Sequence, residues 1–546
     1  MNIKRAKQEI KNCIEAYLMK DGRGEYLLPA VRQRPVLLMG PPGIGKTQIM
    51  EQIARECQVG LVSYTITHHT RQSAIGLPYI VEKEYDGKPC SVTEYTMSEI
   101  VASIYDRMEE TGLKEGILFI DEINCVSETL APMMLQFLQC KTFGNHRIPE
   151  GWIIVTAGNP PEYNKSVREF DIATLDRIKK IDVEADYKVW KEYAVMTDIH
   201  PAVTAYLEAR PEHFYRIETT VDGKRFATPR GWEDLARFLE IYEKLGKTVD
   251  RDVIYQYIEH PGIAKDFANY LELYSKYKTD YQIERILSGE PDTEMARRVA
   301  AAPFDERFSV VSLVLSHLNG KFRDIYLKGR YLELLREKLG MFRQMADEMP
   351  VTEAGTKTVE AKTVEAKTVE AKTVEAKTVE AKTVEAKTVE TKTTESAAGL
   401  LENLAAEMVI DLEKRHKAGL ISRREEHLNR DAADKLQDYA LTLEKEHIVS
   451  PEAGFAKVRE LFREEAREYD TMSETALTML EHGFDFMEAA FAAGQEMVIF
   501  VTELNTNYYS VNFLRENRCE RYYEYNKNLL FEDRESDIRK RLAQRT

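Results

Sequence analysis

Short runs rich in apolar residues recur along the first third of the chain, each bounded by glycine, proline or polar residues. Five of them have strand length, at residues 35–39, 61–65, 116–120, 152–157 and 179–183. Runs of this kind, the third and fourth almost wholly apolar, are typical of strands buried on both faces of a parallel sheet. A segment of helical composition and spacing follows the first run, at residues 48–56. The pattern predicts an α/β fold for this part of the chain.

Helical periodicity replaces the strand pattern further along the chain. The region 185–350 is rich in helical patterns, and its apolar residues crowd so densely at 308–318 that we expect that stretch to be buried. Apolar residues again recur at helical spacing at 400–412, and another helix is predicted to start near Pro451. We therefore expect a C-terminal helical bundle at residues 397–546.

A low-complexity repeat separates the two helical regions. The pentapeptide Lys-Thr-Val-Glu-Ala recurs with few changes from residue 357 to 396. With a period of five, the valines do not fall on one face of a helix, and they do not fall on one face of a strand. The repeat therefore cannot build a core. It predicts a polar tether between domains, assigned to residues 351–396. A solvated single helix is the alternative, because Lys and Glu stand three residues apart in each copy.

Residues 40–47 read Gly-Pro-Pro-Gly-Ile-Gly-Lys-Thr and match the phosphate-loop pattern G-x-x-x-x-G-K-[ST] at every fixed position. They stand between a predicted strand and a predicted helix, which is the context that the pattern requires. The glycines allow backbone N–H groups to face phosphates at the positive end of the following helix. Lys46 would reach the β- and γ-phosphates of ATP, and Thr47 would ligate Mg²⁺. The predicted nucleotide-binding residues are Gly40, Pro41, Pro42, Gly43, Ile44, Gly45, Lys46 and Thr47.

Acidic and amide side chains follow the third and fourth apolar runs. Asp121 and Glu122 end the third run, and Asn159 follows the fourth. Ligands of parallel sheets bind at the carboxyl ends of the strands, so these side chains are expected beside the phosphate loop. Asp121 would complete the Mg²⁺ shell together with Thr47. Glu122 would orient or activate the attacking water, and Asn159 would orient the same water against the γ-phosphate.

Two arginines extend the predicted site. Arg177 stands at the mouth of the fifth run. Arg230 lies in a predicted helix start, with Thr228 as the cap and Pro229 in the first turn. From this position Arg230 would project toward a phosphate.

These elements, in this order, resemble an AAA+ ATPase. The sequence Ile-Pro-Glu-Gly-Trp at 148–152 and the triplet Leu-Asp-Arg at 175–177 resemble the MoxR and dynein-related group of that superfamily. The resemblance implies a P-loop three-layer αβα nucleotide-binding domain at residues 1–184. It also implies a helical lid with further helices at 185–350, ahead of the tether and the C-terminal bundle.

The resemblance further implies roles for single residues. Asn159 corresponds to the sensor-1 residue, Arg230 to the sensor-2 residue, and Arg177 to the arginine finger that acts on a neighbouring subunit's nucleotide. Arg168 is an alternative finger, because the family triplet usually continues with Phe where this chain has Ile178. The predicted catalytic residues are Glu122, Asn159, Arg177 and Arg230.

The function that the resemblance implies is ATP-driven remodelling or assembly of partner proteins by a homo-oligomeric ring, expected to be a hexamer. MoxR-like ATPases commonly act with a von Willebrand factor A domain protein, so such a partner is expected. Two alternatives stay open. One is a motor that acts on nucleic acid, and the other is a nucleotide-gated scaffold whose C-terminal bundle does the binding.

Composition limits the class of partner and the cellular compartment that we expect for this ATPase. Lys and Arg total 76 against 92 Asp and Glu, and the formal net charge of −16 opposes an extended basic footprint for nucleic acid. The six cysteines show no Cys-x-x-Cys spacing, which disfavours a disulfide framework or zinc ribbon and suits a reducing cytoplasm. The first residues lack the apolar core of a signal peptide, and no apolar run reaches the length of a membrane span. We expect a cytoplasmic protein.

Overall fold

The computed structural model describes the chain except for residues 69–75, 144–145, 164–166, 168–169, 222, 291–292, 349–395 and 529–546. Residues 351–395 of the predicted tether and the alternative finger Arg168 lie outside the described residues. By packing, the chain divides into two compact units. Unit 1 comprises Met1–Arg330, Ile410–Leu428 and Arg467–Thr546, and unit 2 comprises Tyr331–Val409 and Asn429–Ala466.

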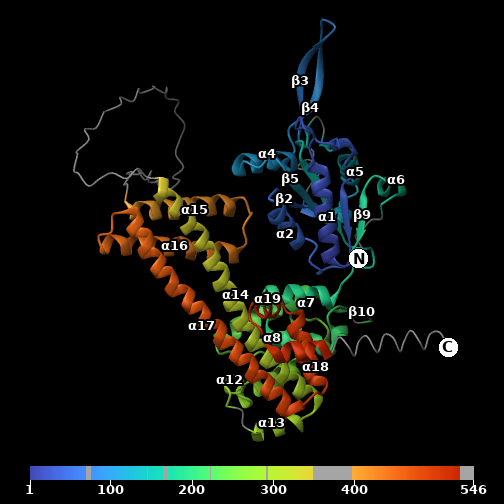
Figure 1. Cartoon of the computed structure of the whole chain (residues 1–546). Helices are drawn as coiled ribbons and strands as arrows, with labels where there is room; N and C mark the ends of the chain where they lie inside the picture. Colours follow the sequence, from blue (N-terminus) through green and yellow to red (C-terminus); the bar gives the residue numbers. More distant parts are fainter. Residues whose placement is uncertain are drawn as a thin grey trace, which may run out of the picture. The chain divides into compact units, whose positions relative to one another are not determined.

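A five-stranded parallel sheet forms the centre of the N-terminal part of unit 1 (Figure 1). Its strands lie in the spatial order β2-β5-β8-β1-β9, so that β8 pairs with both β5 and β1. The strands are β1 (Val36–Met39), β2 (Gly60–Thr65), β5 (Gly116–Asp121), β8 (Trp152–Gly158) and β9 (Lys179–Asp182). Each strand falls on one of the five predicted runs, and the expected α/β fold with a parallel sheet is confirmed.

Helices cover both faces of this sheet. One core joins the sheet to α1 and α2, and a second core joins its other face to α4 and α5. In β5, Ile117 and Phe119 belong to the first core, whereas Leu118 and Ile120 belong to the second. Because both faces are covered, the strand is apolar at every position between its ends. These helices are α1 (Ile3–Leu18), α2 (Gln48–Cys57), α4 (Glu99–Thr111) and α5 (Ala131–Cys140).

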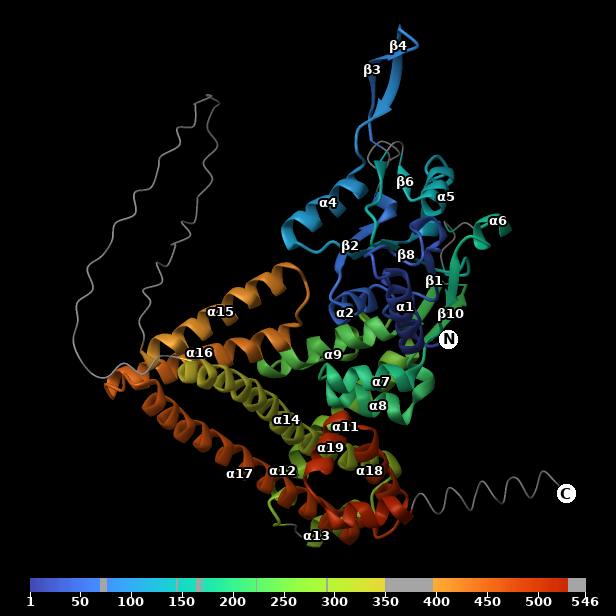
Figure 2. The same cartoon turned by 45° about the horizontal axis from the view of Figure 1, so that its top comes forward.

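Among the described residues of unit 1, three two-stranded antiparallel pairs accompany the sheet. The longest joins β3 (Pro78–Tyr85) to β4 (Lys88–Tyr95) through Asp86 and Gly87, whose φ values of 50° and 73° suit a tight hairpin turn. This hairpin extends away from the sheet in both Figure 1 and Figure 2. The shorter pairs are β6 (Thr142–Phe143) with β7 (His146–Arg147), and β10 (Arg216–Thr220) with β11 (Gly223–Ala227).

The helices that follow the sheet share one large core in unit 1. It contains side chains from α7, α8, α9, α11 and the first half of α14, together with side chains from α17, α18 and α19. The stretch at 308–318 contributes to it, so its predicted burial is confirmed. The helices of this part are α6 (Ile172–Leu175), α7 (Tyr187–Met196), α8 (Pro201–Ala209), α9 (Pro229–Lys244), α10 (Arg251–Tyr255), α11 (Pro261–Asp280), α12 (Ile283–Leu287), α13 (Thr293–Ala300), α14 (Phe304–Glu348), α17 (Pro451–Phe491), α18 (Gln495–Thr506) and α19 (Tyr508–Glu516).

Unit 2 is a helical bundle with its own core. It contains the C-terminal part of α14, the first turns of α17, and parts of α15 (Ala397–Lys417) and α16 (Arg423–Lys445). Each of these helices contributes apolar side chains to the core, among them Leu335, Leu401, Leu436 and Val458. The expected helical character of the C-terminal region is confirmed. The domain boundaries after residues 184, 350 and 396 stay predictions.

Two further findings concern the described residues as a whole. None of their helices is long and apolar enough to cross a membrane. All six cysteines are free, and no group of three or more His, Cys, Asp or Glu side chains among the described residues is placed to hold a metal ion.

Candidate functional site

The phosphate loop connects the carboxyl end of β1 to the start of α2. Gly43 and Gly45 have φ values of 77° and 91°, in the left-handed region that L side chains rarely adopt. A Cβ on Gly43 would also lie 3.2 Å from Thr228, at the start of α9. The loop therefore needs glycine both for its left-handed turns and for its close approach to the start of α9. Its N–H groups precede the positive end of the α2 dipole, which favours an anion.

Lys46 is buried in this loop, with 8% of the residue exposed. Its Nζ donates to two main-chain oxygens of the loop, each at 2.8 Å, and to Oδ1 of Asn159 at 2.9 Å. Burial lowers the pKa of Lys46 to about 8, while the charge of Asp121 opposes this shift and that of Arg230 adds to it. Phosphate oxygens would offer the same donors a charged partner, so the loop is suited to bind an anion.

Thr47 and Asp121, the two predicted metal ligands, lie in contact. Thr47 Oγ1 donates to Asp121 Oδ2 at 2.7 Å, and Asp121 Oδ1 accepts from the N–H of Glu122 at 2.8 Å. A hydroxyl and a carboxylate are the hard oxygen ligands that Mg²⁺ prefers, and Mg²⁺ on a nucleotide takes its other ligands from phosphates and water. The residues present therefore fit the predicted ion.

Glu122 has a left-handed backbone, with a φ of 56°. Its Oε2 accepts a hydrogen bond from Thr67 Oγ1 at 3.2 Å. Thr67 lies in a short helical turn directly after β2, the strand that pairs with β5. Strained non-glycine residues concentrate at functional sites, where the surrounding structure holds them in place. The Thr67 hydroxyl thus restrains the Glu122 carboxylate, which is predicted to orient water.

Asn159 directly follows β8, the strand between β5 and β1. Its main-chain oxygen accepts from Nδ2 of Asn124 at 2.8 Å, while its side-chain oxygen binds Lys46. The carbonyl oxygen of Gly158 accepts from the N–H of Gly40 at 3.3 Å. Asn159 is thereby tied both to the phosphate loop and to the segment that follows β5.

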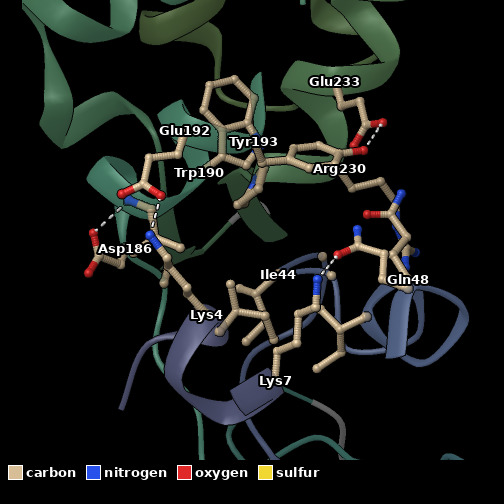
Figure 3. A pocket seen from close by; sticks show the side chains of 18 of the residues that line it. Lys4, Lys7, Ile44, Gln48, Asp186, Trp190, Glu192, Tyr193, Arg230 and Glu233 are labelled. Carbon is tan, nitrogen blue, oxygen red and sulfur yellow. Dashed lines mark hydrogen bonds and ion pairs between the residues drawn. The ribbon is translucent and has the colours of Figure 1, made fainter. Parts of the chain in front are cut away.

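A cavity of about 500 Å³ opens beside the phosphate loop (Figure 3). Ile44 and Gln48 line it from the loop and α2, and Arg230 lines it from the first turn of α9. Lys4 of α1 and Trp190 of α7 line the other sides. A pocket of this size that combines an aromatic ring, aliphatic side chains and cations suits a flat base together with charged phosphates.

Polar contacts join the helices that form the cavity walls. Lys4 Nζ lies 2.5 Å from Glu192 Oε2 and joins α1 to α7. The Tyr193 hydroxyl donates to Glu233 Oε1 at 3.0 Å and joins α7 to α9. Sequence reasoning missed these walls, because α1 and α7 carry no motif and only the fold brings them to the phosphate loop.

Arg177 makes its side-chain hydrogen bond outside the phosphate loop. It is exposed, it follows α6, and its Nη1 donates to the main-chain oxygen of Ala173 at 2.7 Å. It is not among the described residues that line the cavity. The structure therefore gathers Lys46, Thr47, Asp121 and Asn159 within one chain and leaves Arg177 outside that group.

Residues 35–178 match the family described as AAA domain (dynein-related subfamily). Comparison with curated proteins found no match. Among solved structures, the chain is similar to the RuvB Holliday junction branch migration motor of Thermotoga maritima, at 18% identity and a TM-score of 0.27, over 47% of this chain and 69% of that chain. A point mutant of the same RuvB gives 18% identity and a TM-score of 0.26, over 52% and 78%. The matched residues include Lys46, Asp121 and Asn159, and the match supports an AAA+ ATPase domain in this part of the chain.

Proposed function

We propose that this chain is a Mg²⁺-dependent ATPase that works as a homo-oligomeric ring of six and uses ATP turnover to remodel or assemble partner proteins. The observation that carries the ATPase activity is the convergence of Lys46, Thr47, Asp121 and Asn159, which hydrogen bonds of 2.7 to 2.9 Å connect in pairs. Phosphoryl transfer depends on positioning and charge stabilisation more than on covalent chemistry, and this set of side chains offers both.

Each residue has a defined task in this ATPase. The Lys46 ammonium and the N–H groups of the phosphate loop bind phosphate oxygens. Thr47 and Asp121 hold Mg²⁺, which neutralises phosphate charge when bound. Glu122 orients the attacking water and accepts its proton, and Asn159 fixes the direction of attack.

In the proposed ring, the exposed Arg177 acts on the nucleotide of the neighbouring subunit. Lys46→Ala and Arg177→Ala are each expected to lower ATP hydrolysis at least about tenfold. In an equimolar mixture, a subunit with an intact phosphate loop can receive Arg177 from a Lys46→Ala neighbour. Random assembly then places an intact finger beside an intact loop at about a quarter of the interfaces, so about that share of activity should return. Normal turnover by Arg177→Ala alone, or no recovery on mixing, would contradict a finger that acts in trans.

The proposed clients and partners are proteins, including a von Willebrand factor A domain protein. The formal charge of −16 supports this choice, because phosphate backbones are bound mainly through Lys and Arg. Addition of the client should stimulate ATP turnover by the full chain, and addition of DNA or RNA should not. Stimulation by nucleic acid in the absence of protein clients would overturn the choice of substrate class while leaving the ATPase activity in place.

A further inference from the structure

Asn124 lies in a short helical turn, Ile123–Cys125, that directly follows Asp121 and Glu122. It is 2% exposed. Its Nδ2 donates to the main-chain oxygen of Asn159 at 2.8 Å, and its Oδ1 has no hydrogen-bond partner among the described residues. A carbonyl oxygen only accepts hydrogen bonds, so the amide nitrogen of Asn124, and not its oxygen, must face Asn159.

Stability does not account for an asparagine at this place. Burial removes water from both polar atoms of the amide, and only one of them regains a partner. An apolar side chain of similar shape, such as leucine, would fill the space without an unpaired oxygen. Buried polar atoms without a partner are uncommon in proteins, and each one calls for a reason other than packing.

The hydrogen bond from Asn124 holds the main chain of Asn159, which lies just beyond the sheet. The parallel ladder between β1 and β8 ends at Gly158, and Asn159 lies beyond it. The next residue is Pro160, which has no N–H to share in a further ladder. Asn124 thus links Asn159 to the segment that carries Glu122 two residues earlier.

Gly158 leaves the room that this link requires. A Cβ built on Gly158 would lie 2.5 Å from Oδ1, 2.9 Å from Cγ and 3.1 Å from Nδ2 of Asn124. The whole amide of Asn124 therefore packs against the backbone of residue 158. Any side chain larger than hydrogen at this position would displace the amide from the Asn159 carbonyl.

We propose that Asn124 is a positioning residue for ATP hydrolysis. By holding the backbone of Asn159, it sets where the Asn159 amide stands relative to the Glu122 carboxylate, the two groups that orient the attacking water. This role rests on the proposed ATPase function. Lys46 and the phosphate loop bind phosphates without help from Asn124, so loss of Asn124 changes turnover more than affinity.

Asn124→Leu in the full chain tests the role, because it removes the hydrogen bond and keeps the site filled with apolar atoms. We expect kcat to fall about 10- to 100-fold, as when reacting groups shift by about 1 Å. The Kd for ATP should stay within about threefold, because the phosphate loop is untouched. Ile154→Val is the matched control, since it trims a buried side chain of β8, the strand that leads to Asn159, and should keep wild-type kcat. A wild-type kcat in Asn124→Leu, or a loss of ATP affinity as large as the loss of kcat, would overturn the role.

Gly158→Ala perturbs the same contact while Asn124 stays in place, and it covers the case in which Asn124→Leu fails to fold. Its methyl group would displace the Asn124 amide, so kcat should fall about as much as in Asn124→Ala, a variant that lacks the amide. In the double variant, Asn124→Ala with Gly158→Ala, the shortened side chain leaves room for the methyl group. The double variant should therefore be no slower than Asn124→Ala alone. Additive losses in the double variant would overturn the role. A wild-type chain that hydrolyses no ATP would overturn the proposed function itself, whereas normal wild-type turnover with unchanged variants would overturn only the positioning role.

Discussion

Lys46 shows how a single residue prepares the site for an anion. Its ammonium is buried, and the oxygens that it contacts belong to neutral carbonyl and amide groups. Burial therefore outweighs the attraction of Asp121, and the pKa of Lys46 falls to about 8. A phosphate would supply the missing negative charge, so nucleotide binding should favour the protonated form of Lys46.

The affinity for ATP should accordingly fall as the pH rises above about 8. Below that pH Lys46 already carries its charge, whereas above it binding must also protonate the amine, and affinity should drop toward about tenfold per pH unit. Calorimetric titrations across this range check the slope, and at pH 8 they should show uptake of about half a proton per nucleotide. An affinity that is constant through this range would contradict the buried and partly neutral Lys46.

At the same scale, the sequence predicts residues that a motif or a strand end marks better than residues whose role depends on a contact made in the folded chain. Lys46, Asp121 and Asn159 were predictable because a loop pattern or the end of a buried strand marks each of them. Thr67 and Asn124 were not, since a threonine after a strand and an asparagine in a turn are common. Only the fold brings these two to the catalytic groups.

At the scale of elements, apolar runs predicted the five-stranded sheet but not the β3–β4 hairpin. A strand buried on both faces is apolar throughout, and that pattern is visible in the sequence. The hairpin strands are exposed over most of their length, so no buried set of side chains marks them. The dipeptide Asp86-Gly87 between two strand-like segments was the available signal for this turn.

Helix α7 offers a test of where the nucleotide base lies. Trp190 lines the cavity from α7, whereas Trp152 is buried in the core on one face of the sheet and does not line the cavity. A base in the cavity would contact the Trp190 ring, so tryptophan fluorescence should change when ATP binds. Trp190→Phe should remove most of that change, and Trp152→Phe should retain it. The same change in Trp190→Phe as in the wild type would place the base elsewhere.

At the scale of the whole molecule, helices far apart in sequence share the core of unit 1. Lys191 of α7 lies 2.6 Å from Glu503 of α18 and 2.9 Å from Glu208 of α8. Burial raises the pKa of Glu503, although Lys191 opposes that rise. Local periodicity predicts such helices but not their partners, because a contact between residues 312 positions apart leaves no mark on either segment.

Loss of Lys191 should weaken this long-range connection. Lys191→Met leaves two acidic side chains without their cation, and the free energy of unfolding should fall by about 2–3 kcal/mol. This is at or just below the lower end of the range for broken buried pairs, because the three side chains keep some solvent contact. The midpoint of urea unfolding measures this loss. Lys4→Met is the matched control. It breaks an exposed ion pair with Glu192, which lies on α7 next to Lys191, and it should change stability by less than about 1 kcal/mol.

The deficit of Lys191→Met should also depend on pH. Without Lys191, the pKa of the partly buried Glu503 lies still further above its value in the unfolded chain, so ionised Glu503 destabilises the folded state. This penalty is full above the raised pKa, shrinks as the pH falls below it, and is gone below the pKa of the unfolded chain, because the protonated carboxyl needs no cation. A deficit that is equal at neutral and acidic pH would contradict the raised pKa of Glu503.

The most direct measurement is steady-state phosphate release from Mg²⁺-ATP by the wild-type chain and by Glu122→Gln, with bound ATP determined on the same samples. Glu122→Gln keeps the phosphate loop, Thr47 and Asp121 but lacks the carboxylate that orients water. The wild type should release phosphate, and Glu122→Gln should bind ATP as tightly while releasing phosphate at least about 100-fold more slowly. Equal rates from the two proteins, or a wild type that binds no ATP, would contradict hydrolysis at this site.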